Sequence, residues 1–365
     1  MKIAYDLRRI MNVGIGRYME TLVTSVVEAA PQHDYLLILP RGSKHLAHLP
    51  ARVQRVYARS DYYSISEQFE LPSILKKHEV DLLHAPHFVV PLRKTCATVS
   101  TIHDVIHLVY PQDIKSPLGR IYARLMMQAA LRVSDKVVTV SEYSKQDIVR
   151  RAGGDAKKID VIFPFLAAGL TKVTDLAALQ AVRDHYGIRR NYILYMGILR
   201  ERKNHAGLLR AFAKLIERGY DLDVVISGPI APTESSLDGL VKELALEGRV
   251  IIAGFVPEEE IAALYSGASI YACPSLYEGF GYTPLEAMAC GTPVVCHEGT
   301  SLPEVCGDAA LYCDARNPDE FATTLAQVLD NADLRNSLIE RGLNNIQRYS
   351  AQDSSSAILQ LYSSL

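Results

Sequence analysis

Short apolar runs rich in β-branched residues recur along the whole chain and alternate with longer, mixed stretches. In the first half these runs are residues 2–7, 35–39, 52–57, 81–85, 97–102, 136–140 and 160–162. In the second half they are residues 192–197, 223–227, 249–252, 269–272, 293–296 and 310–312. Runs that are short and apolar throughout are typical of parallel strands buried on both faces, and the stretches between most of them predict helices. The pattern therefore predicts an α/β protein with doubly wound parallel sheets.

The alternation of strands and helices starts again at Tyr192, which predicts two domains. The segment before it, residues 163–191, carries Pro164 and Gly169 and then a charged stretch expected to be helical. A chain of 365 residues also suits two domains of common size. We therefore expect an N-terminal Rossmann-like domain at 1–170, a second at 171–348 and a C-terminal helix at 349–365. Open α/β sheets bind ligands at the carboxyl ends of their strands, so the site is expected in a cleft between the domains.

The composition is that of a globular protein, with 48% hydrophobic and 22% charged residues. The six cysteines are irregularly spaced and include no Cys-x-x-Cys pair, which argues against a disulfide framework or a zinc site. The first residues enter a strand directly, and no run of 18 apolar residues occurs. The expected compartment is therefore the cytoplasm.

Charge is divided unevenly between the two halves. Residues 1–170 hold 23 Lys and Arg against 16 Asp and Glu, whereas the remainder holds 16 against 25. A basic first half is compatible with peripheral contact at the inner face of an anionic membrane or with an acidic acceptor, and equally with ordinary scatter of surface charge. No tight basic run or aromatic-basic interleaving occurs, so a nucleic-acid partner is not expected.

Two carboxylates eight positions apart, Glu278 and Glu286, enclose a Gly-Phe-Gly turn and a proline. A helix-forming run follows and then a β-branched strand. This order predicts a loop that enters a helix at its N-terminal end, where free backbone N–H groups and the helix dipole favour an anion. Glu278 is expected in the loop and Glu286 in the helix. A ligand with hydroxyls at one end, phosphates in the middle and a ribose at the other fits this layout, which indicates a nucleotide sugar.

This stretch resembles the Glu-x7-Glu motif of retaining glycosyltransferases of family 4, whose GT-B fold places two Rossmann-like domains across a cleft. Further matches occur in family order, at Gly14-Ile15-Gly16-Arg17-Tyr18, Thr101-Ile102-His103-Asp104, Arg202-Lys203-Asn204 and Gly254-Phe255-Val256-Pro257. Together they span nearly the whole chain. The last helix of the family often crosses back to the first domain, and residues 350–365 are placed to do so. The Trp that commonly precedes that helix is missing here, where the chain reads Tyr349-Ser350-Ala351.

The resemblance implies catalytic roles for four residues: His103, Arg202, Lys203 and Glu278. The basic pair would stabilise the negative charge that develops on the departing phosphate. His103 would hydrogen-bond a sugar hydroxyl or that phosphate, with a structural role at the strand end as the alternative. Glu278 would contact sugar hydroxyls and assist the anomeric centre.

Donor binding is implied for a second set: Gly14, Gly16, Gly228, Val256, Phe280, Gly281, Thr283 and Glu286. Backbone N–H groups of Phe280 and Gly281 would reach sugar hydroxyls, and Thr283 would meet the phosphates. Glu286 would accept both ribose hydroxyls, which suits a carboxylate with two oxygens. Gly228 and Val256 would border the base. Candidates for acceptor contacts are Tyr18, Tyr62 and Phe88, and Tyr18 fits packing of its helix equally well.

The resemblance also implies that no metal and no cofactor other than the nucleotide-sugar substrate are needed, since the basic pair takes the place of a cation. One Asp-x-Asp sequence, Asp221-Leu222-Asp223, starts a predicted strand at the end away from the expected ligand, so we interpret it as surface. Gly14-x-Gly16 does not complete the dinucleotide fingerprint, because position 19 is Met.

The sequence as a whole predicts retaining transfer of a hexose from a nucleotide sugar to an acceptor hydroxyl. Gly-Ile-Gly-Arg-Tyr and Arg-Lys-Asn look most like bacterial mannosyltransferases of polysaccharide and O-antigen assembly, which makes GDP-mannose the first expected donor and a sugar or lipid-linked sugar the acceptor. UDP-glucose and other UDP-sugars stay open as donors. A nucleotide-sugar epimerase of the same fold and a non-catalytic nucleotide-sugar-binding subunit are the alternatives from other classes.

Overall fold

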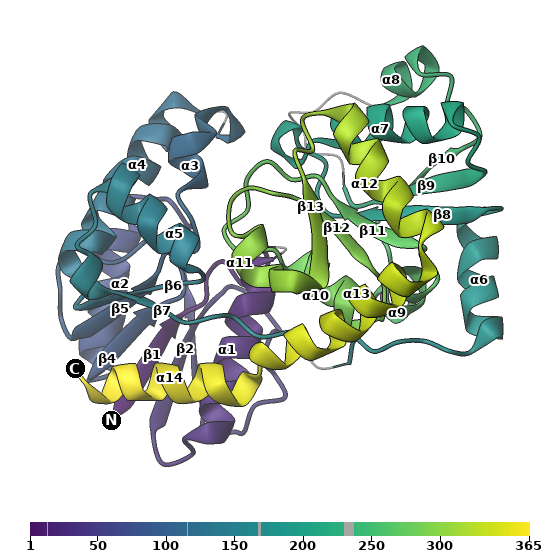
Figure 1. Ribbon diagram of the computed structural model, residues 1–365. Coiled ribbons are helices and arrows are strands. Elements are labelled where there is room, and N and C mark those ends of the chain that lie inside the picture. Colours follow the sequence, from purple (N-terminus) through teal and green to yellow (C-terminus); the bar gives the residue numbers. More distant parts are fainter. Residues whose placement is uncertain (13, 115, 167–168, 230–236) are drawn as a thin grey trace. The chain divides into compact units, whose positions relative to one another are not determined.

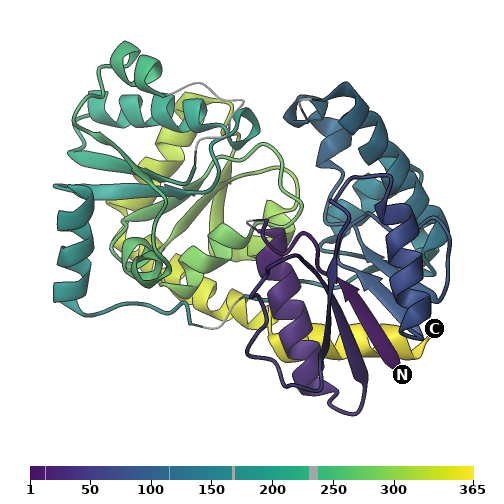
Figure 2. The same ribbon diagram turned by 180° about the vertical axis from the view of Figure 1, so that it is seen from behind.

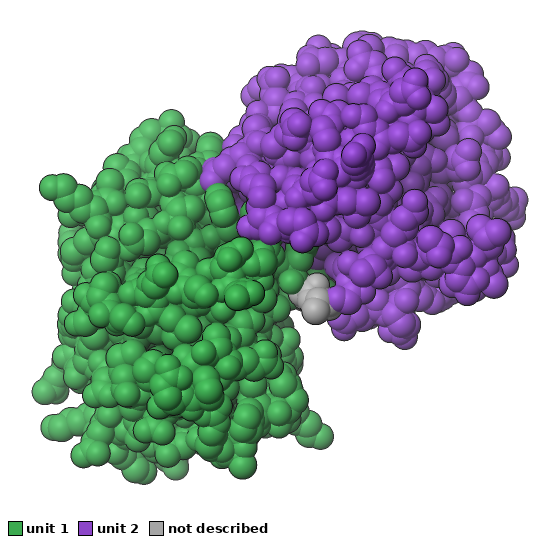
Figure 3. Space-filling model, turned by 60° about the horizontal axis from the view of Figure 1, so that its bottom comes forward, with its two compact units in different colours: residues 1–167, 349–365 green, residues 168–348 purple. Residues whose placement is uncertain are grey.

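The computed structural model describes residues 1–12, 14–114, 116–166, 169–229 and 237–365. The chain divides into two compact units, coloured separately in Figure 3. Unit 1 comprises residues 1–167 and 349–365, and unit 2 comprises residues 168–348. The C-terminal segment thus belongs to the same unit as the N-terminus.

Unit 1 is built on a seven-stranded sheet with the order β3-β2-β1-β4-β5-β6-β7, in which all neighbouring strands are parallel. The strands are β1 (Lys2–Asp6), β2 (Asp34–Pro40), β3 (Gln54–Ala58), β4 (Leu82–Ala85), β5 (Ala97–Thr101), β6 (Lys136–Thr139) and β7 (Ile159–Val161). The chain winds outward from β1 in one direction and from β4 in the other. The carboxyl ends of β1 and β4 therefore form a switch point, where the outgoing loops diverge and leave room for a ligand.

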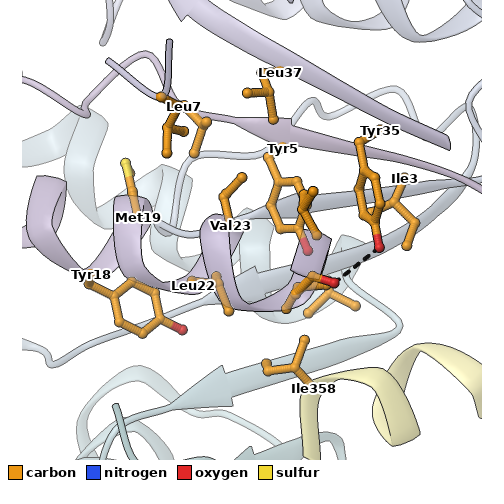
Figure 4. Close-up of a cluster of buried hydrophobic side chains, with 14 of the residues drawn as sticks. Ile3, Tyr5, Leu7, Tyr18, Met19, Leu22, Val23, Tyr35, Leu37 and Ile358 are labelled. Carbon is orange, nitrogen blue, oxygen red and sulfur yellow. Dashed lines mark hydrogen bonds between the residues drawn. The ribbon is translucent and has the colours of Figure 1, made fainter. Parts of the chain in front are cut away.

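Helices cover both faces of this sheet (Figures 1 and 2). They are α1 (Ile15–Ala29), α2 (Glu67–Lys77), α3 (Ile106–Val109), α4 (Pro117–Val133), α5 (Glu142–Asp147) and α14 (Ala351–Ser363). Side chains of α1 and α14 join one core cluster with the β1 residues Ile3 and Tyr5, part of which Figure 4 shows. The opposite face of β1 carries Ala4, which packs in a cluster with α2. Successive strand residues therefore point to opposite faces and are buried on both, as the apolar runs predict.

The entry to α14 is fixed by an aromatic contact. Tyr349 is buried, and its ring meets that of Phe163 at 5.6 Å between centroids and 73° between planes. The Ser354 hydroxyl then donates to the carbonyl oxygen of Phe163 at 2.7 Å. A tyrosine thus makes the buried contact at the position where the family commonly has Trp.

Unit 2 has a six-stranded parallel sheet with the order β10-β9-β8-β11-β12-β13. Its strands are β8 (Asn191–Met196), β9 (Leu222–Ser227), β10 (Val250–Gly254), β11 (Ile270–Cys273), β12 (Val294–His297) and β13 (Ala310–Cys313). Its helices are α6 (Leu176–Tyr186), α7 (His205–Glu217), α8 (Asp238–Glu243), α9 (Glu258–Ser266), α10 (Tyr282–Ala289), α11 (Leu302–Cys306), α12 (Pro318–Asp330) and α13 (Ala332–Asn345). The order reverses between β8 and β11, so the loops after these two strands meet at a second switch point.

Each strand expected from the sequence is present in the described residues, with ends that differ by at most two positions. The interpretation of Asp221-Leu222-Asp223 as surface is wrong for Asp223, which is buried. Its carboxylate accepts the backbone N–H groups of Arg189 and Arg190, each at 3.0 Å, and pairs with the Arg190 guanidinium at 2.8 Å. A carboxylate with this set of donors is satisfied structurally at the start of its strand.

Candidate active site

The basic pair of unit 2 lies in the loop after β8. Arg202 and Lys203 are half-buried and form a single 3-10 turn, Glu201–Lys203, that Asn204 ends with a left-handed conformation (φ 56°, ψ 40°). The Asn204 side chain caps α7 by accepting the Gly207 N–H at 3.2 Å. The carbonyl oxygen of Arg202 accepts the N–H of Leu276 at 2.8 Å. This bond ties the loop after β8 to the loop after β11, as the switch point requires.

The loop after β11 brings Glu278 onto Lys203. The ammonium donates to Glu278 Oε1, and the two side chains are only 17% and 15% exposed. Burial opposes ionisation of the carboxyl, but Lys203 and Arg202 outweigh it, so the pKa of Glu278 is lowered. Glu278 is therefore ionised at neutral pH, and its negative charge is stabilised by the two cations.

Two hydroxyl residues after β12 hold the Glu278 loop. The Ser301 hydroxyl lies 3.0 Å from the carbonyl oxygen of Glu278 and 2.8 Å from that of Phe280. The Thr300 hydroxyl accepts the Glu278 N–H at 3.4 Å. Sequence reasoning missed both residues, although a hydroxyl pair in the loop after a buried strand indicates a candidate site at that edge of the sheet.

Gly281 starts α10 in a conformation that requires glycine. Its φ is 105°, and a Cβ at this position would lie 2.9 Å from Leu302 Cδ2. The tight turn leads from Phe280, which is buried, into the first turn of the helix, where Thr283 interacts with the Tyr271 hydroxyl. The first backbone N–H groups of α10 have no partners within the helix, as at every helix start. They are the predicted phosphate site.

Glu286 lies one turn into α10 and is buried. The Tyr265 hydroxyl donates to Glu286 Oε2 at 3.0 Å. Burial raises the pKa of Tyr265 well above its usual value, and the neighbouring carboxylate adds to this shift, so the phenol keeps its proton and acts as the donor. Tyr265, in α9, was not among the predicted site residues.

The predicted base-binding residues follow two neighbouring strands: Gly228 follows β9, and Val256 follows β10. A Cβ on Gly228 would lie 2.0 Å from the carbonyl oxygen of Gly197, so only glycine fits between the ends of β8 and β9. The N–H of Gly228 donates to the carbonyl oxygen of Gly254 at 2.8 Å. Val256 is buried, whereas its neighbour Phe255 is 82% exposed.

His205 is a further residue that sequence reasoning missed. It opens α7 two positions after Lys203, is buried, and sets its ring edge-on to Tyr195 at 4.5 Å between centroids. Burial and then Lys203 lower the pKa of His205 to about 4, so the imidazole is neutral. One ring nitrogen bonds the backbone of Arg200, and Nε2 has no hydrogen-bond partner among the described residues. The ring thus supports the turn that carries the basic pair.

In unit 1, His103 follows β5 at the carboxyl edge of the sheet. Its Nε2 donates to the carbonyl oxygen of Pro86 at 3.1 Å, and its ring stands at 88° to that of Tyr18, with centroids 4.7 Å apart. Burial lowers the pKa of His103, so the ring is neutral. Tyr18 lies in α1, just after the predicted glycines. A Cβ on Gly16 would lie 2.0 Å from the carbonyl oxygen of Ile10, and Gly14 has a φ of 90°.

The candidate acceptor residues form two groups. Tyr18 is buried, and its hydroxyl lies 3.3 Å from Thr101 Oγ1. Tyr62 hydrogen-bonds His87 Nδ1 and lies under the Arg9 guanidinium, 4.8 Å from the ring centroid. Phe88 is buried against the His87 ring, with centroids 4.1 Å apart.

The structure thus brings Arg202, Lys203, Glu278 and Phe280 together in unit 2, and His103 together with Tyr18 in unit 1. Within the described ranges, no group of three or more His, Cys, Asp or Glu side chains is arranged to hold a metal ion.

Comparison with known proteins decides the family. A model of glycosyl transferases group 1 matches residues 182–345, and a model of glycosyltransferase family 4 matches residues 13–166. The chain belongs to the family 4 glycosyltransferases. The three predicted motif regions of unit 2 fall inside the first match, and His103 falls inside the second.

Relatives of this glycosyltransferase include O-antigen enzymes. O-antigen chain mannosyltransferase B from Escherichia coli is 28% identical over 364 residues, 98% of this chain and 94% of the relative. An O-antigen chain mannosyltransferase from Salmonella typhimurium is 27% identical over 288 residues, 79% and 75% of the two chains. A D-inositol 3-phosphate glycosyltransferase from Corynebacterium aurimucosum is 30% identical over 282 residues, 74% and 63% of the two. The predicted likeness to bacterial mannosyltransferases is confirmed.

Solved structures confirm the GT-B fold. Sucrose-phosphate synthase from Thermosynechococcus elongatus matches with a TM-score of 0.80 at 18% identity, covering 100% of this chain and 98% of that one. HepE from Anabaena, solved in complex with UDP and glucose, matches with a TM-score of 0.80 at 20% identity and covers 100% of both chains. The glycosyltransferase contains, among its described residues, no helix with the length and apolar character needed to cross a membrane.

Proposed function

We propose that this glycosyltransferase moves a hexose from a nucleotide sugar to an acceptor hydroxyl with retention at the anomeric carbon. The observation that carries the proposal is the half-buried Lys203–Glu278 pair, with Arg202 beside it, in the loop before α10. The cations suit a phosphate, and the carboxylate beside them suits the hydroxyl groups of the neighbouring sugar.

The proposed chemistry places cations on the leaving group. As the bond from the anomeric carbon to the phosphate oxygen breaks, Arg202 and Lys203 stabilise the negative charge that the diphosphate gains. The acceptor oxygen bonds the anomeric carbon on the same face, and its proton passes to the departing phosphate oxygen. Glu278, held ionised, contacts sugar hydroxyls and the positive charge that develops at the anomeric centre. The basic pair takes the role that a divalent metal has in other glycosyltransferases, so we propose that the reaction needs no metal or cofactor.

The proposed donor pose follows the order of residues along the site. Glu278 and the backbone of Phe280 and Gly281 take the sugar, and the start of α10 takes the phosphates. Glu286 takes the ribose hydroxyls, with Tyr265 holding its second oxygen. The base then lies by Gly228 and Val256, and His103, Gly14 and Gly16 contribute to the donor from unit 1.

GDP-mannose is the donor that we propose first, because the O-antigen mannosyltransferases of Escherichia coli and Salmonella typhimurium align over most of this chain. A UDP-sugar is the second candidate, favoured by the similarity in fold to HepE, which was solved with UDP and glucose. The acceptor that we propose is a sugar or a lipid-linked sugar, contacted by Tyr18, Tyr62 or Phe88, and unit 1 is proposed to contact a membrane from the cytoplasmic side.

Thermal unfolding with GDP, UDP, GDP-mannose and UDP-glucose, each with and without EDTA, tests the proposal. We expect GDP-mannose to raise the melting temperature equally in both conditions. A preference for UDP-glucose would change the donor and keep the mechanism, whereas loss of the shift in EDTA would overturn the metal-free reaction.

Product analysis separates the proposed reaction from its alternatives. With an acceptor oligosaccharide, NMR of the new glycoside is expected to show the anomeric configuration of the donor, and inversion would contradict the mechanism. Conversion of the nucleotide sugar into its epimer without any acceptor would instead indicate an epimerase of the same fold.

A further inference from the structure

One surface of unit 1 exposes large apolar side chains from three segments. We call it the α2–α4 patch; its residues are Ile65, Phe69, Leu92, Leu118, Ile121 and Leu125. Their exposed fractions range from 53% for Leu92 to 78% for Leu118. Single exposed apolar residues are ordinary, but a contiguous group of large ones on a soluble domain marks an interaction site.

Hydrogen bonds through Gln68 show that the three segments are neighbours. Gln68 lies in α2 beside Phe69, and its Oε1 accepts the N–H of Leu92 at 2.9 Å. Its Nε2 donates to the carbonyl oxygen of Val90 at 3.3 Å and lies 3.5 Å from Met126 Sδ in α4. The start of α2, the segment at Leu92 and the middle of α4 therefore share one surface.

Helix α4 has the features of an amphipathic helix that lies in a membrane interface. Leu118, Ile121 and Leu125 follow one another at spacings of three and four, so they share a face. The side turned to the sheet buries Ala123, Met126, Met127, Ala129 and Ala130. The helix carries Arg120, Arg124 and Arg132 and no acidic residue. An apolar face with arginines beside it and no carboxylates is typical of interfacial helices at anionic lipids.

We propose that the α2–α4 patch docks on a lipid bilayer that carries anionic headgroups. The charge favours this partner, because the exposed Arg93 follows Leu92 and adds to the arginines of α4, whereas Lys94 is paired with Asp135. A second copy of the chain is disfavoured, because two-fold pairing of the patch would place basic rims against each other. The inference deepens the proposed function by assigning the membrane contact to named residues, and it is independent of the donor chemistry.

Vesicle sedimentation of the full chain tests the proposal. We expect the protein to pellet with mixed phosphatidylglycerol–phosphatidylcholine vesicles, less with phosphatidylcholine alone, and less again at high salt. The double variant Leu118→Ser/Leu125→Ser is expected to bind the mixed vesicles less, by roughly tenfold for each side chain. Leu176→Ser in unit 2 is the matched control, since Leu176 is 80% exposed at the start of α6 and lies outside the patch.

Two outcomes would overturn the membrane proposal. One is equal vesicle binding by wild type, Leu118→Ser/Leu125→Ser and Leu176→Ser. The other is a loss of self-association in the double variant, seen by analytical ultracentrifugation without vesicles, which would assign the patch to a second copy. The thermal unfolding transition of each variant, measured without ligand, shows whether it is folded, so a failure here is distinct from a failure of the proposed transfer reaction.

A second inference rests on a buried hydrogen-bond chain that runs from α14 to the end of β5. The Tyr362 hydroxyl lies 3.0 Å from that of Tyr5 and 2.5 Å from His84 Nδ1. His84 Nε2 lies 2.9 Å from Thr101 Oγ1, which lies 3.3 Å from the Tyr18 hydroxyl. Tyr18 in turn packs edge-on against His103. The C-terminal helix is thereby joined to the candidate catalytic histidine within one unit.

The chain can run in either of two directions. Burial lowers the pKa of His84 to about 3, so its ring is neutral, with one N–H donor and one acceptor nitrogen. If Nδ1 accepts, hydrogens run from Tyr5 to Tyr362, His84, Thr101 and Tyr18, and if Nδ1 donates they run the opposite way. In both cases the Tyr362 hydroxyl is the group that bonds Nδ1 and thereby sets the tautomer of His84.

We infer that Tyr362 is a positioning residue for the transfer reaction. Its hydroxyl bonds Nδ1 and so holds the tautomer and orientation of His84, and His84 in turn bonds the Thr101 hydroxyl that meets Tyr18. Tyr18 packs against His103, at the sheet edge where the donor is proposed to bind. The inference rests on the proposed function for its kinetic consequence and on geometry alone for the tautomer.

The variant Tyr362→Phe, which removes one oxygen, tests this inference. We expect kcat to fall, by up to roughly 100-fold, with little change in the KM of the donor, since the reacting groups are displaced rather than removed. In ¹⁵N NMR of the ring, His84 is expected to change its tautomer balance. Tyr35→Phe is the matched control, because Tyr35 is equally buried but donates to the backbone carbonyls of Val26 and Ala30, outside the chain.

Wild-type kcat together with an unchanged His84 tautomer in Tyr362→Phe would overturn the inference. An equal fall of kcat in Tyr35→Phe would also overturn it, because the loss would then follow from general destabilisation of unit 1. The tautomer measurement needs no substrate, so it stands even if the donor assignment fails.

Discussion

At the scale of single residues, the candidate site depends on a charge balance at Glu278. A buried carboxylate is stable only if its partners remain, and removing one partner leaves an uncompensated charge. Lys203 is the partner in contact, and Arg202 adds to its effect on the carboxyl. When a nucleoside diphosphate binds, its phosphates compete for the same cations. The Lys203 ammonium thus interacts both with Glu278 and, in the proposed complex, with the phosphates. Its loss is expected to affect the leaving phosphate and, separately, the pKa of Glu278.

The first prediction concerns Lys203→Met. We expect kcat to fall by about 100-fold or more, because a cation that stabilises the departing phosphate is lost. We also expect the pKa of Glu278 to rise, because burial favours the neutral carboxyl and Lys203 opposes it. The acid limb of the kcat/KM profile should therefore move to higher pH, which steady-state kinetics across the pH range measures.

Lys214→Met is the control for Lys203→Met. Lys214 also lies in unit 2 and pairs with a carboxylate, Asp319, but on the surface of α7 and α12. Surface pairs contribute little, so kcat and its pH profile should stay as in wild type. If Lys203→Met is folded and keeps wild-type turnover, the proposed mechanism loses its central cation.

At the scale of elements, the start of α10 depends on a glycine. Gly281 combines a φ of 105° with a neighbour, Leu302 Cδ2, 2.9 Å from where a Cβ would stand. Leu302 is fully buried at the start of α11 and cannot move aside at low cost. A side chain at position 281 must therefore displace the backbone between Phe280 and Thr283, which carries the predicted sugar and phosphate contacts.

The second prediction is that Gly281→Ala weakens donor binding and lowers thermal stability together. Gly219→Ala separates the two causes, because Gly219 has a similar φ of 92° but nothing within 4 Å of an added Cβ. The left-handed conformation alone costs about 1–2 kcal/mol in either variant. Gly281→Ala should be less stable than Gly219→Ala in urea unfolding and should alone lose affinity for the nucleotide sugar. Equal effects on both properties would argue against a role for the turn in donor binding.

Elements were predictable from the sequence because strands such as β8 and β12 are buried on both faces and read as unbroken apolar runs. The motifs placed Arg202 and Glu278 at carboxyl ends of strands, and the switch point then brings them together. The hydrogen-bond partners that tertiary packing brings together were not predictable from the sequence. Ser301 holds the Glu278 loop from 23 positions away, and Tyr362 reaches His84 from the far end of the chain. A hydroxyl group carries no periodicity that would reveal its partner.

At the scale of the whole molecule, each unit keeps neutral histidines in its interior. Burial lowers the pKa of His84 in unit 1 to about 3 and that of His205 in unit 2 to about 4. The unfolded chain binds protons at these sites near the ordinary value of 6.5, and the folded chain binds them only at lower pH. Stability must therefore rise with pH across this interval and be lost as the pH falls below about 6.5.

The third prediction follows for His205→Gln. At neutral pH the variant should be less stable than wild type, because it loses the buried ring and its bond to the backbone of Arg200. Between pH 6.5 and about 4 the wild type must exclude a proton that its unfolded chain binds, whereas the variant need not. The difference in unfolding free energy should therefore narrow by about 1.4 kcal/mol for each pH unit. Urea unfolding of both proteins at several pH values measures this slope. A constant difference would show that the folded chain binds the proton at the same pH as the unfolded chain, and hence that folding does not lower the pKa of His205.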